Sequence, residues 1–517
     1  MRVRRLFPLL LLTALTTASL AFGQTDTPVG DDPDPDALAR VAKSDVVDAS
    51  TGGQVLRSGD HFVQEGHVFL PKGVNFELHG HPWSLWPNYW NQTSDVEAEL
   101  DRARRLGANV IRVFVTSDNF GGVPANYDVG PKDPNGHVWD TALSQLDDFL
   151  RRADGHGLKV LLTLYDGLNG FRTVNGLCRG QIGNPSARGE AWDWQNTSPD
   201  SNGNTWYHGP DIRPFRNHAD EILTRLIPGT NRVLANDSRI FGWDVLNEPD
   251  HLFTQPSCSF YSKDYVNAWI GWMARHVRIY TQAPITAGTY GWFLNPNDRD
   301  RGSIQFNSSW MDYSTSGGGR SLWDDLDFIA IHWYQPVDRF GSALSTTKNY
   351  LYGRIAGGKP VMVEEIGQAD NGWYKVGSTC YAQSMPGCNG NLSCNRSWIR
   401  NWTASWAPTA KSYGVGSLVW TGSDFVSTGS CSNGGEWNQD FFGFYDGNAG
   451  LKPAGQVFAP ANSDTACTRA AFRTKDGLHW LTAQNGGGPG SYLDASGSGG
   501  SPGANSIFSL VHTGDAI

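Results

Sequence analysis

Two glutamates in this sequence lie where a pair of carboxyl groups could cleave a glycosidic bond. Glu248 ends the apolar run that begins at Ile240, and Glu365 ends the run that begins at Pro360. Such cleavage needs one carboxyl group that gives up a proton and a second that attacks the sugar or activates water. Aromatic burial raises the pKa of the acid, whereas a nearby arginine or tyrosine hydroxyl keeps the second group ionised.

Side chains that could support this pair also end or interrupt apolar runs. Arg112 lies inside the run 109–115, His332 and Tyr334 follow the run 327–331, and Trp420 ends the run 416–420. Glu364 makes the second carboxylate ambiguous by one position. Because side chains alternate along a strand, we expect only one of Glu364 and Glu365 to point toward the site, and the following Gly367 favours Glu365.

Eight apolar runs must position these groups, and helical patterns separate most of them. Strands that are apolar on both faces and separated by helices predict a parallel sheet, and eight such units predict an α/β fold, a closed (β/α)8 TIM barrel. No glycine-rich dinucleotide fingerprint follows an early strand, so an open doubly wound sheet is disfavoured. Catalytic groups of such barrels lie where the strands end. The eight runs are 72–76, 109–115, 159–165, 240–246, 284–287, 327–331, 360–363 and 416–420.

Two motifs resemble those of clan A retaining glycoside hydrolases, most closely glycoside hydrolase family 5, which contains cellulases and mannanases. Leu246-Asn247-Glu248-Pro249 resembles the Asn-Glu-Pro motif of that clan, and Glu365-Ile366-Gly367 resembles its nucleophile strand. The resemblance spans roughly residues 60–460 and implies a retaining β-glycosidase. One departure is Ile366, because the residue after the nucleophile is usually aromatic in the family.

The resemblance implies a role for each matching residue. Glu248 would be the acid/base and Glu365 the nucleophile, and Arg112 and Tyr334 would orient Glu365. Asn247 would bind the 2-hydroxyl group of the sugar, His332 would line the subsite of the cleaved sugar, and Trp420 would stack beneath that sugar. The mechanism requires no metal or organic cofactor.

Two alternatives remain at this point. His79 and His81 form a His-x-His pair after the first strand, as in metal-dependent amidohydrolases, but the fifth strand ends in Thr286-Ala287-Gly288 without the expected histidine. We therefore expect His79 and His81 to bind substrate hydroxyls and expect no metal site. The second alternative is a non-catalytic carbohydrate-binding barrel, which the presence of both glutamates with Arg112 and Tyr334 disfavours.

The ends of the chain differ in composition from its centre. Residues 1–23 have a basic start, an apolar centre and a small-residue exit, as in a secretory signal peptide; a membrane anchor is the alternative. An acidic linker or arm follows over 24–58, then the catalytic domain over 59–460. Residues 461–517 are rich in Gly and Ser with β-strand patterns. The stretch from His479 to Ala495 resembles one repeat of a fascin-like β-trefoil, which would make it a partial trefoil.

Charge and cysteine content narrow the function classes. The chain has 41 Lys and Arg against 51 Asp and Glu, which gives no basic footprint for nucleic acid or anionic lipid. We expect a secreted monomer that contacts no membrane after signal cleavage and acts on a neutral β-linked polysaccharide or oligosaccharide. Seven cysteines suit disulfides in an oxidising compartment, and the odd number leaves at least one unpaired within the chain, with Cys467 as the candidate.

Overall fold

The computed structural model describes the barrel and parts of the C-terminal segment. The described residues are 53–79, 85–86, 89–116, 140–166, 213–249, 263–289, 312–315, 318–334, 340–355, 357–371, 373–376, 379–382, 384–425, 441–446, 450–462, 468–471, 479–483, 493–498 and 507–510. The expected signal peptide, most of the expected arm, His81, and four of the cysteines (Cys178, Cys258, Cys431 and Cys467) lie outside them.

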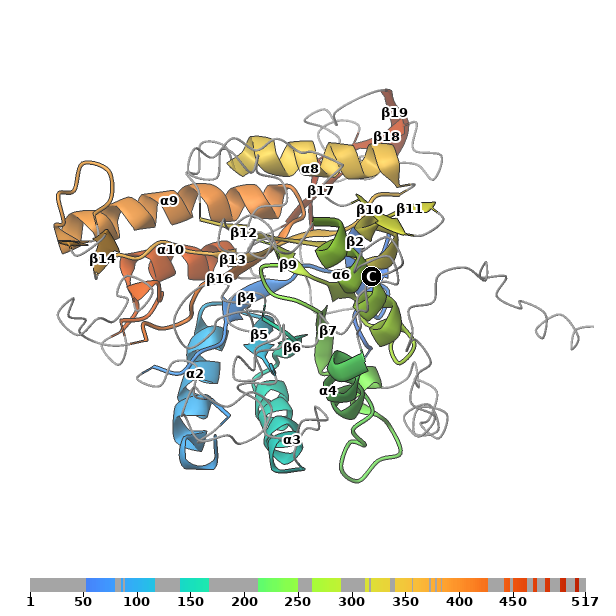
Figure 1. Cartoon of the computed structure of the whole chain (residues 1–517). Helices are drawn as coiled ribbons and strands as arrows, with labels where there is room; N and C mark the ends of the chain where they lie inside the picture. The colour runs from blue at the N-terminus through green and yellow to red at the C-terminus, as the bar shows by residue number, and fades with distance from the viewer. Residues whose placement is uncertain are drawn as a thin grey trace, which may run out of the picture.

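A closed ring of parallel strands confirms the predicted (β/α)8 barrel (Figure 1). The fifth strand is divided at Ala287: β8 pairs with β7 on one side, and β9 pairs with β12 on the other, so the ring closes. The ring strands are β4 (Lys72–Asn75), β5 (Val110–Phe114), β6 (Lys159–Thr163), β7 (Ile240–Asp244), β8 (Ile285–Thr286), β9 (Gly288–Thr289), β12 (Ile329–Trp333), β13 (Val361–Ile366) and β16 (Gly416–Val419).

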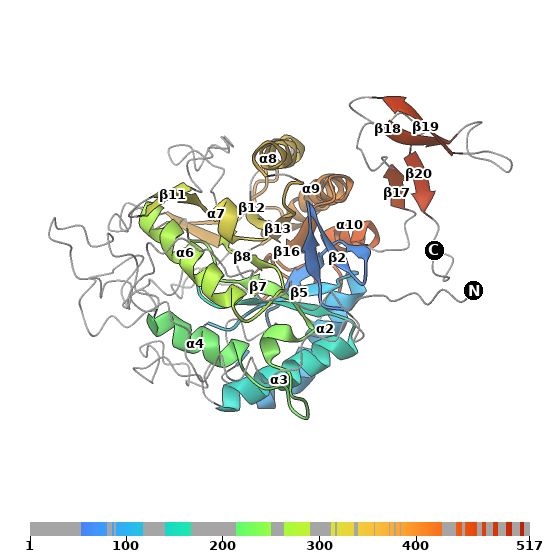
Figure 2. The ribbon, with the colours of Figure 1, turned by 90° about the vertical axis from the view of Figure 1, so that its right-hand side faces the viewer.

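Helices surround the ring on its outer side (Figure 2). They are amphipathic: α3 buries Leu143, Leu146 and Leu150 at helical spacing and leaves its other face to solvent. The helices are α2 (Thr93–Arg105), α3 (Asp140–Gly155), α4 (Arg213–Leu223), α6 (Lys263–Arg278), α7 (Leu322–Asp325), α8 (Phe340–Arg354), α9 (Leu392–Ser412) and α10 (Pro453–Asn462), with 3-10 turns η1 (Tyr89–Asn91) and η3 (Leu234–Asn236).

A three-stranded antiparallel sheet packs against one end of the barrel. It consists of β1 (Leu56–Ser58), β2 (His61–Gln64) and β3 (His67–Phe69). Phe62 and Val55 of this region share a core cluster with side chains of the ring strands, such as Phe241 and Leu418. The folded domain therefore begins before residue 59, and the expected linker 24–58 is wrong at its end, because Val55 is completely buried.

An extra residue interrupts the regular pairing of β13. Ile331 pairs with Val363, but the next residue, His332, pairs with Glu365, and the pairing with β16 shifts over the same stretch. Such a bulge breaks the strict alternation of side chains along a strand. The expectation that only one of Glu364 and Glu365 faces the site is therefore wrong, since both contact Arg112.

Short antiparallel pairs lie outside the ring. Within the described C-terminal residues they are β17 (Thr468–Ala471) with β20 (Ile507–Leu510), and β18 (His479–Ala483) with β19 (Leu493–Ser498). The β-rich appendage thus has two strand pairs, and the partial trefoil stays a prediction. Two further pairs are β10 (Asp312–Thr315) with β11 (Gly318–Ser321), and β14 (Trp373–Val376) with β15 (Thr379–Ala382).

A disulfide joins Cys388 to Cys394 at the start of α9, with a Cα–Cα distance of 5.3 Å. Among the helices in the described residues, none combines the length and apolar character needed to cross a bilayer.

Candidate active site

Glu248 and Glu365 meet at the end of the barrel opposite the three-stranded sheet. Glu248 comes four residues after the end of β7, and Glu365 lies near the end of β13. One oxygen of each carboxylate and a ring nitrogen of His332 all lie within 4.8 Å of one another. Both glutamates are almost fully buried. The two carboxyl groups proposed from their sequence positions are therefore neighbours in space.

Arg112 organises the polar centre from β5. Its guanidinium donates through Nη1 to Glu365 Oε1 at 2.6 Å and through Nη2 to Asp244 Oδ2 at 2.6 Å. Its Nε lies 3.2 Å from Glu364 Oε1. Three carboxylates therefore surround one fully buried cation. Burial alone would lower the pKa of Arg112, but these carboxylates raise it above its usual value, so the side chain stays charged.

Glu365 has a separate partner for each carboxylate oxygen. Oε1 accepts from Arg112, and Oε2 accepts from the Tyr334 hydroxyl at 2.6 Å. Burial raises the pKa of Glu365 above that of a free glutamate, whereas His332, Arg112 and the Tyr334 hydrogen bond oppose this rise. Charge and hydrogen bonding thus favour the ionised form that a nucleophile needs.

His332 connects the two glutamates from the end of β12. Its Nδ1 lies 2.9 Å from Glu248 Oε1 and 3.3 Å from Glu365 Oε2, and its Nε2 lies 3.2 Å from Glu364 Oε2. Burial disfavours the charged imidazolium, but the surrounding carboxylates outweigh it and raise the pKa of His332 to about 10. His332 is therefore a second cation within the same group of carboxylates.

Asn247 bridges two strands beside the carboxyl pair. Its side-chain oxygen accepts from Arg112 Nη2 at 2.7 Å, and its amide donates to Asp166 Oδ1 at 3.0 Å. Glu248 follows with a positive φ of 45°, and its backbone N–H donates to the Gly288 carbonyl at 2.7 Å. A non-glycine residue in this conformation is strained by about 1–3 kcal/mol, a feature common at functional sites.

Trp420, which follows β16, is almost fully buried among other aromatic rings. It packs edge-on against Phe114 and Phe425, with ring centroids 6.4 and 6.3 Å apart. Tyr334 belongs to the same cluster. Gly367 allows its own backbone to lie close to the backbone of Trp420, because a Cβ at position 367 would lie 2.3 Å from the Trp420 carbonyl oxygen.

The contacts of His79 are with residues other than Glu248 and Glu365. Its Nδ1 lies 2.6 Å from the backbone oxygen of Asp424, and the Asp424 carboxylate accepts from Lys452 at 2.7 Å. In the described part of the chain, the group with metal-ligand spacing is Glu248, His332 and Glu365, which does not include His79. Arg112 already places a positive charge 2.6 Å from Glu365, which disfavours a cation there.

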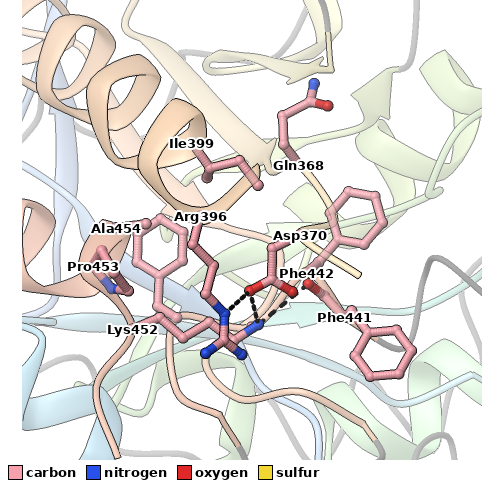
Figure 3. A pocket seen from close by; sticks show the side chains of 11 residues that line it. Gln368, Asp370, Arg396, Ile399, Phe441, Phe442, Lys452, Pro453 and Ala454 are labelled. Atoms are coloured by element: carbon pink, nitrogen blue, oxygen red, sulfur yellow. Dashed lines mark hydrogen bonds and ion pairs between the residues drawn. The ribbon is translucent and has the colours of Figure 1, made fainter. Parts of the chain in front are cut away.

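A small hollow follows β13 and is lined by Gln368, Asp370, Arg396 and Lys452, among others (Figure 3). Asp370 at its wall binds Arg396 at 2.7 Å and Lys452 at 3.1 Å, so these charged groups neutralise one another. Gln368 connects the hollow with the site, because its amide donates to the Tyr334 carbonyl at 2.8 Å. A residue of the hollow wall therefore holds the backbone of Tyr334, whose side-chain hydroxyl contacts Glu365.

Sequence reasoning missed three polar residues of this centre, Asn75, Asp166 and Asp244, and considered Glu364 only as an alternative to Glu365. Asn75 donates to the Glu364 and Val419 carbonyls and accepts from Arg112. Asp244 and Glu364 flank Arg112, and Asp166 holds Asn247. Burial raises the pKa of Asp244 to about 6, with a further contribution from Glu364 and opposition from Arg112. The sequence did contain a signal for two of them. Asp244 and Asn75 are polar residues inside apolar runs, as Arg112 is.

The chain is similar to a known family and to several known proteins. The model of a family described as GH family 5 beta-mannosidase-like matches residues 54–385. The mannan endo-1,4-beta-mannosidase 2 of Arabidopsis thaliana is 24% identical over 347 residues, covering 60% of this chain and 68% of the relative. The mannan endo-1,4-beta-mannosidase 1 of Oryza sativa subsp. japonica is 24% identical over 345 residues, covering 62% and 69%.

Solved structures of similar proteins include an endo-1,4-beta-mannanase from Rhizomucor miehei. It has a TM-score of 0.49 and 17% identity, covering 79% of this chain and 99% of that one. An exo-beta-1,4-mannosidase from Opitutaceae bacterium strain TAV5 has a TM-score of 0.47 and 18% identity, covering 81% and 62%.

Proposed function

The chain belongs to the glycoside hydrolase family 5 β-mannosidase-like family, and on this premise we propose that it hydrolyses β-1,4-mannosidic bonds with retention of configuration. That it is a glycosyl hydrolase follows from the family. The choice of mannan or manno-oligosaccharide is supported by the names of the relatives, which are mannan endo-1,4-beta-mannosidases.

The short distance between the two carboxylates carries the proposal of retention. An oxygen of Glu248 lies within 4.8 Å of an oxygen of Glu365. Retaining enzymes keep their carboxyl groups about 5–5.5 Å apart, whereas inverting enzymes leave about 6.5–9.5 Å for a water molecule. The short separation supports direct attack by one carboxylate on the sugar.

The environments of the two glutamates support their assignment. Glu365 accepts from Arg112 and Tyr334, which stabilise a carboxylate, so it attacks the anomeric carbon and forms a glycosyl-enzyme. Glu248 protonates the leaving oxygen, then removes a proton from the water that releases the sugar. In this proposal Asn247 hydrogen-bonds the 2-hydroxyl group, and the small exposed part of Trp420 contacts the cleaved sugar.

A substrate panel with stereochemical analysis tests this function. The purified protein is assayed on β-mannan, β-1,4-glucan, xylan and aryl β-mannosides, and the first-formed anomer is identified by NMR. We expect hydrolysis of mannan or mannosides with the β-anomer formed first. An α-anomer would contradict retention, and activity on glucan or xylan alone would contradict the substrate assignment.

Azide rescue distinguishes the two glutamates. With an activated aryl β-mannoside, Glu365→Ala in azide should give the α-mannosyl azide, because azide replaces the nucleophile on the opposite face. Glu248→Ala should give the β-mannosyl azide, because azide attacks the glycosyl-enzyme. The same azide product from both variants would refute the assignment. Asp220→Ala, which removes a buried carboxylate of the outer helix α4, is the matched control that needs no rescue.

Export is a separate proposal. The basic and apolar residues of segment 1–23 and the disulfide between Cys388 and Cys394 support a secreted protein. Sequencing the N-terminus of protein recovered from the culture medium tests it. We expect a mature chain that begins close to Gln24; a chain retained in the cell with Met1 intact would contradict export.

A further inference from the structure

Glu364 is a completely buried carboxylate that the proposed mechanism leaves without a role. Its Oε2 lies 3.2 Å from Nε2 of His332, and its Oε1 lies 3.2 Å from Nε of Arg112. Glu364 reaches both His332 and Arg112 because the bulge in β13 turns its side chain into the barrel along with that of Glu365. A buried charge is costly unless it is paired, so this position needs a physical reason.

Gly288 of β9 provides the space for this carboxylate. A Cβ atom at position 288 would lie 2.0 Å from Glu364 Oε2 and 2.7 Å from His332 Nε2. Any side chain at this position would therefore displace the contact between Glu364 and His332. The fifth strand thus has a glycine where the ring nitrogen and the buried carboxylate meet.

We propose that Glu364 is a positioning residue that holds His332 through Nε2, so that a proton on Nδ1 lies between Glu248 and Glu365. The inference rests on the proposed function of these two glutamates. Both nitrogens of a charged imidazole are donors, and here each nitrogen faces a carboxylate. Glu364 fixes the ring orientation, and its charge keeps the proton on the ring.

Charged groups face His332 from several elements. Glu248 follows β7, Glu364 and Glu365 belong to β13, and Arg112 of β5 lies behind both β13 carboxylates. Gly288 of β9 brings no charge. The three carboxylates together favour the imidazolium and raise the pKa of His332 to about 10, despite its burial. Because the groups interact strongly, the cluster titrates as a unit.

The conservative variant Glu364→Gln tests the role. It keeps the shape and an acceptor oxygen but removes a negative charge 3.2 Å from the ring. Removing that charge should lower every apparent pKa of the cluster, so both limbs of the kcat/KM profile against pH should move to lower pH by about one unit. A profile reduced only in height, with both limbs at their wild-type positions, would overturn the proposal.

Asp220→Asn is the matched control. Asp220 is likewise a buried carboxylate that accepts from a buried imidazole, His276 Nε2, at 2.5 Å, but it lies on the outer helix α4. This variant should leave both limbs unchanged. A shift in the control equal to that of Glu364→Gln would mean that the pH profile reports lost stability, and it would also overturn the proposal.

A second measurement does not depend on activity. NMR of the wild-type protein with labelled histidine, with the His332 signal assigned from its absence in His332→Gln, follows ring protonation directly. We expect His332 to stay charged above pH 8; deprotonation near pH 6.5 would overturn the inference. A wild type that hydrolyses no glycoside would refute the proposed function, while this titration, compared between the wild type and Glu364→Gln, would still test Glu364.

Discussion

Glu364 and Glu365 are consecutive in the chain, yet both carboxylates contact the guanidinium of Arg112 in the barrel interior. A regular strand would send them to opposite faces. The bulge in β13 removes this constraint, so one strand supplies both the candidate nucleophile and the buried carboxylate beneath it.

Tyr334→Phe should shift the acidic limb of the activity profile. The Tyr334 hydroxyl donates to Glu365 and lowers its pKa, in opposition to burial. Without this bond the pKa of Glu365 rises further, so we expect the acidic limb of kcat/KM to move to higher pH and the maximum to fall about 10-fold, the value of one hydrogen bond to a charged group. An acidic limb that moves to lower pH would contradict this explanation.

Arg112→Met should destabilise the fold as well as reduce activity. The variant leaves Asp244, Glu364 and Glu365 buried without their shared cation, which should reduce the free energy of unfolding by about 3–5 kcal/mol in urea denaturation. The control Arg105→Ala breaks the exposed pair between Arg105 and Asp101 and should change it by less than about 1 kcal/mol. An equal loss of unfolding free energy in the two variants would show that Arg112 does not stabilise the buried carboxylates.

Gly288→Ala should reduce kcat more than it changes KM. The added methyl group would lie 2.0 Å from Glu364 Oε2, so Glu364 and His332 must move apart while the rest of the cleft is retained. We expect kcat to fall at least 10-fold, measured on an aryl β-mannoside. Gly155→Ala at the end of α3, where a Cβ meets nothing within 4 Å, is the control and should behave as wild type. Unchanged kcat in Gly288→Ala would contradict the tight contact.

His218 should make the protein lose stability as the pH falls. It is buried on α4, its Nε2 lies 2.7 Å from the Val115 carbonyl, and burial lowers its pKa to about 4. In the unfolded chain His218 binds a proton near pH 6.5, whereas in the folded chain it stays neutral until about pH 4. The free energy of unfolding is therefore highest above pH 6.5 and declines as the pH falls toward 4. We expect His218 to account for about 3 kcal/mol of that loss.

Urea denaturation between pH 4 and 7 measures this contribution. The variant His218→Gln keeps a side-chain donor but does not titrate, so its stability should fall less steeply over this range than that of the wild type. Parallel curves for the two proteins would exclude His218 as the cause.

The barrel could be predicted from the sequence because its signals are local. Each ring strand is an apolar run between turn residues, and polar residues at the ends of the runs, such as Glu248 and Tyr334, identified the site. Glu364 could not be assigned in this way, because its direction depends on how β13 pairs with β12 and β16, both distant in sequence. The three carboxylates around His332 likewise depend on closure of the ring.

The start of the domain shows the same limit. Leu56–Ser58 has the sequence character of a polar arm, but it forms β1, and its neighbour Val55 is buried. Only the pairing with β2 and the need to cover the open end of the barrel reveal that these residues belong to the fold.

The extra residue in β13 also constrains how this protein can evolve. Deleting one residue there would restore regular pairing with both neighbouring strands, but it would remove one of two adjacent acidic side chains from the interior. Selection for a more regular sheet and selection for turnover therefore oppose each other at this point. Directed evolution for heat resistance alone should favour loss of the bulge, whereas selection for catalysis should retain it.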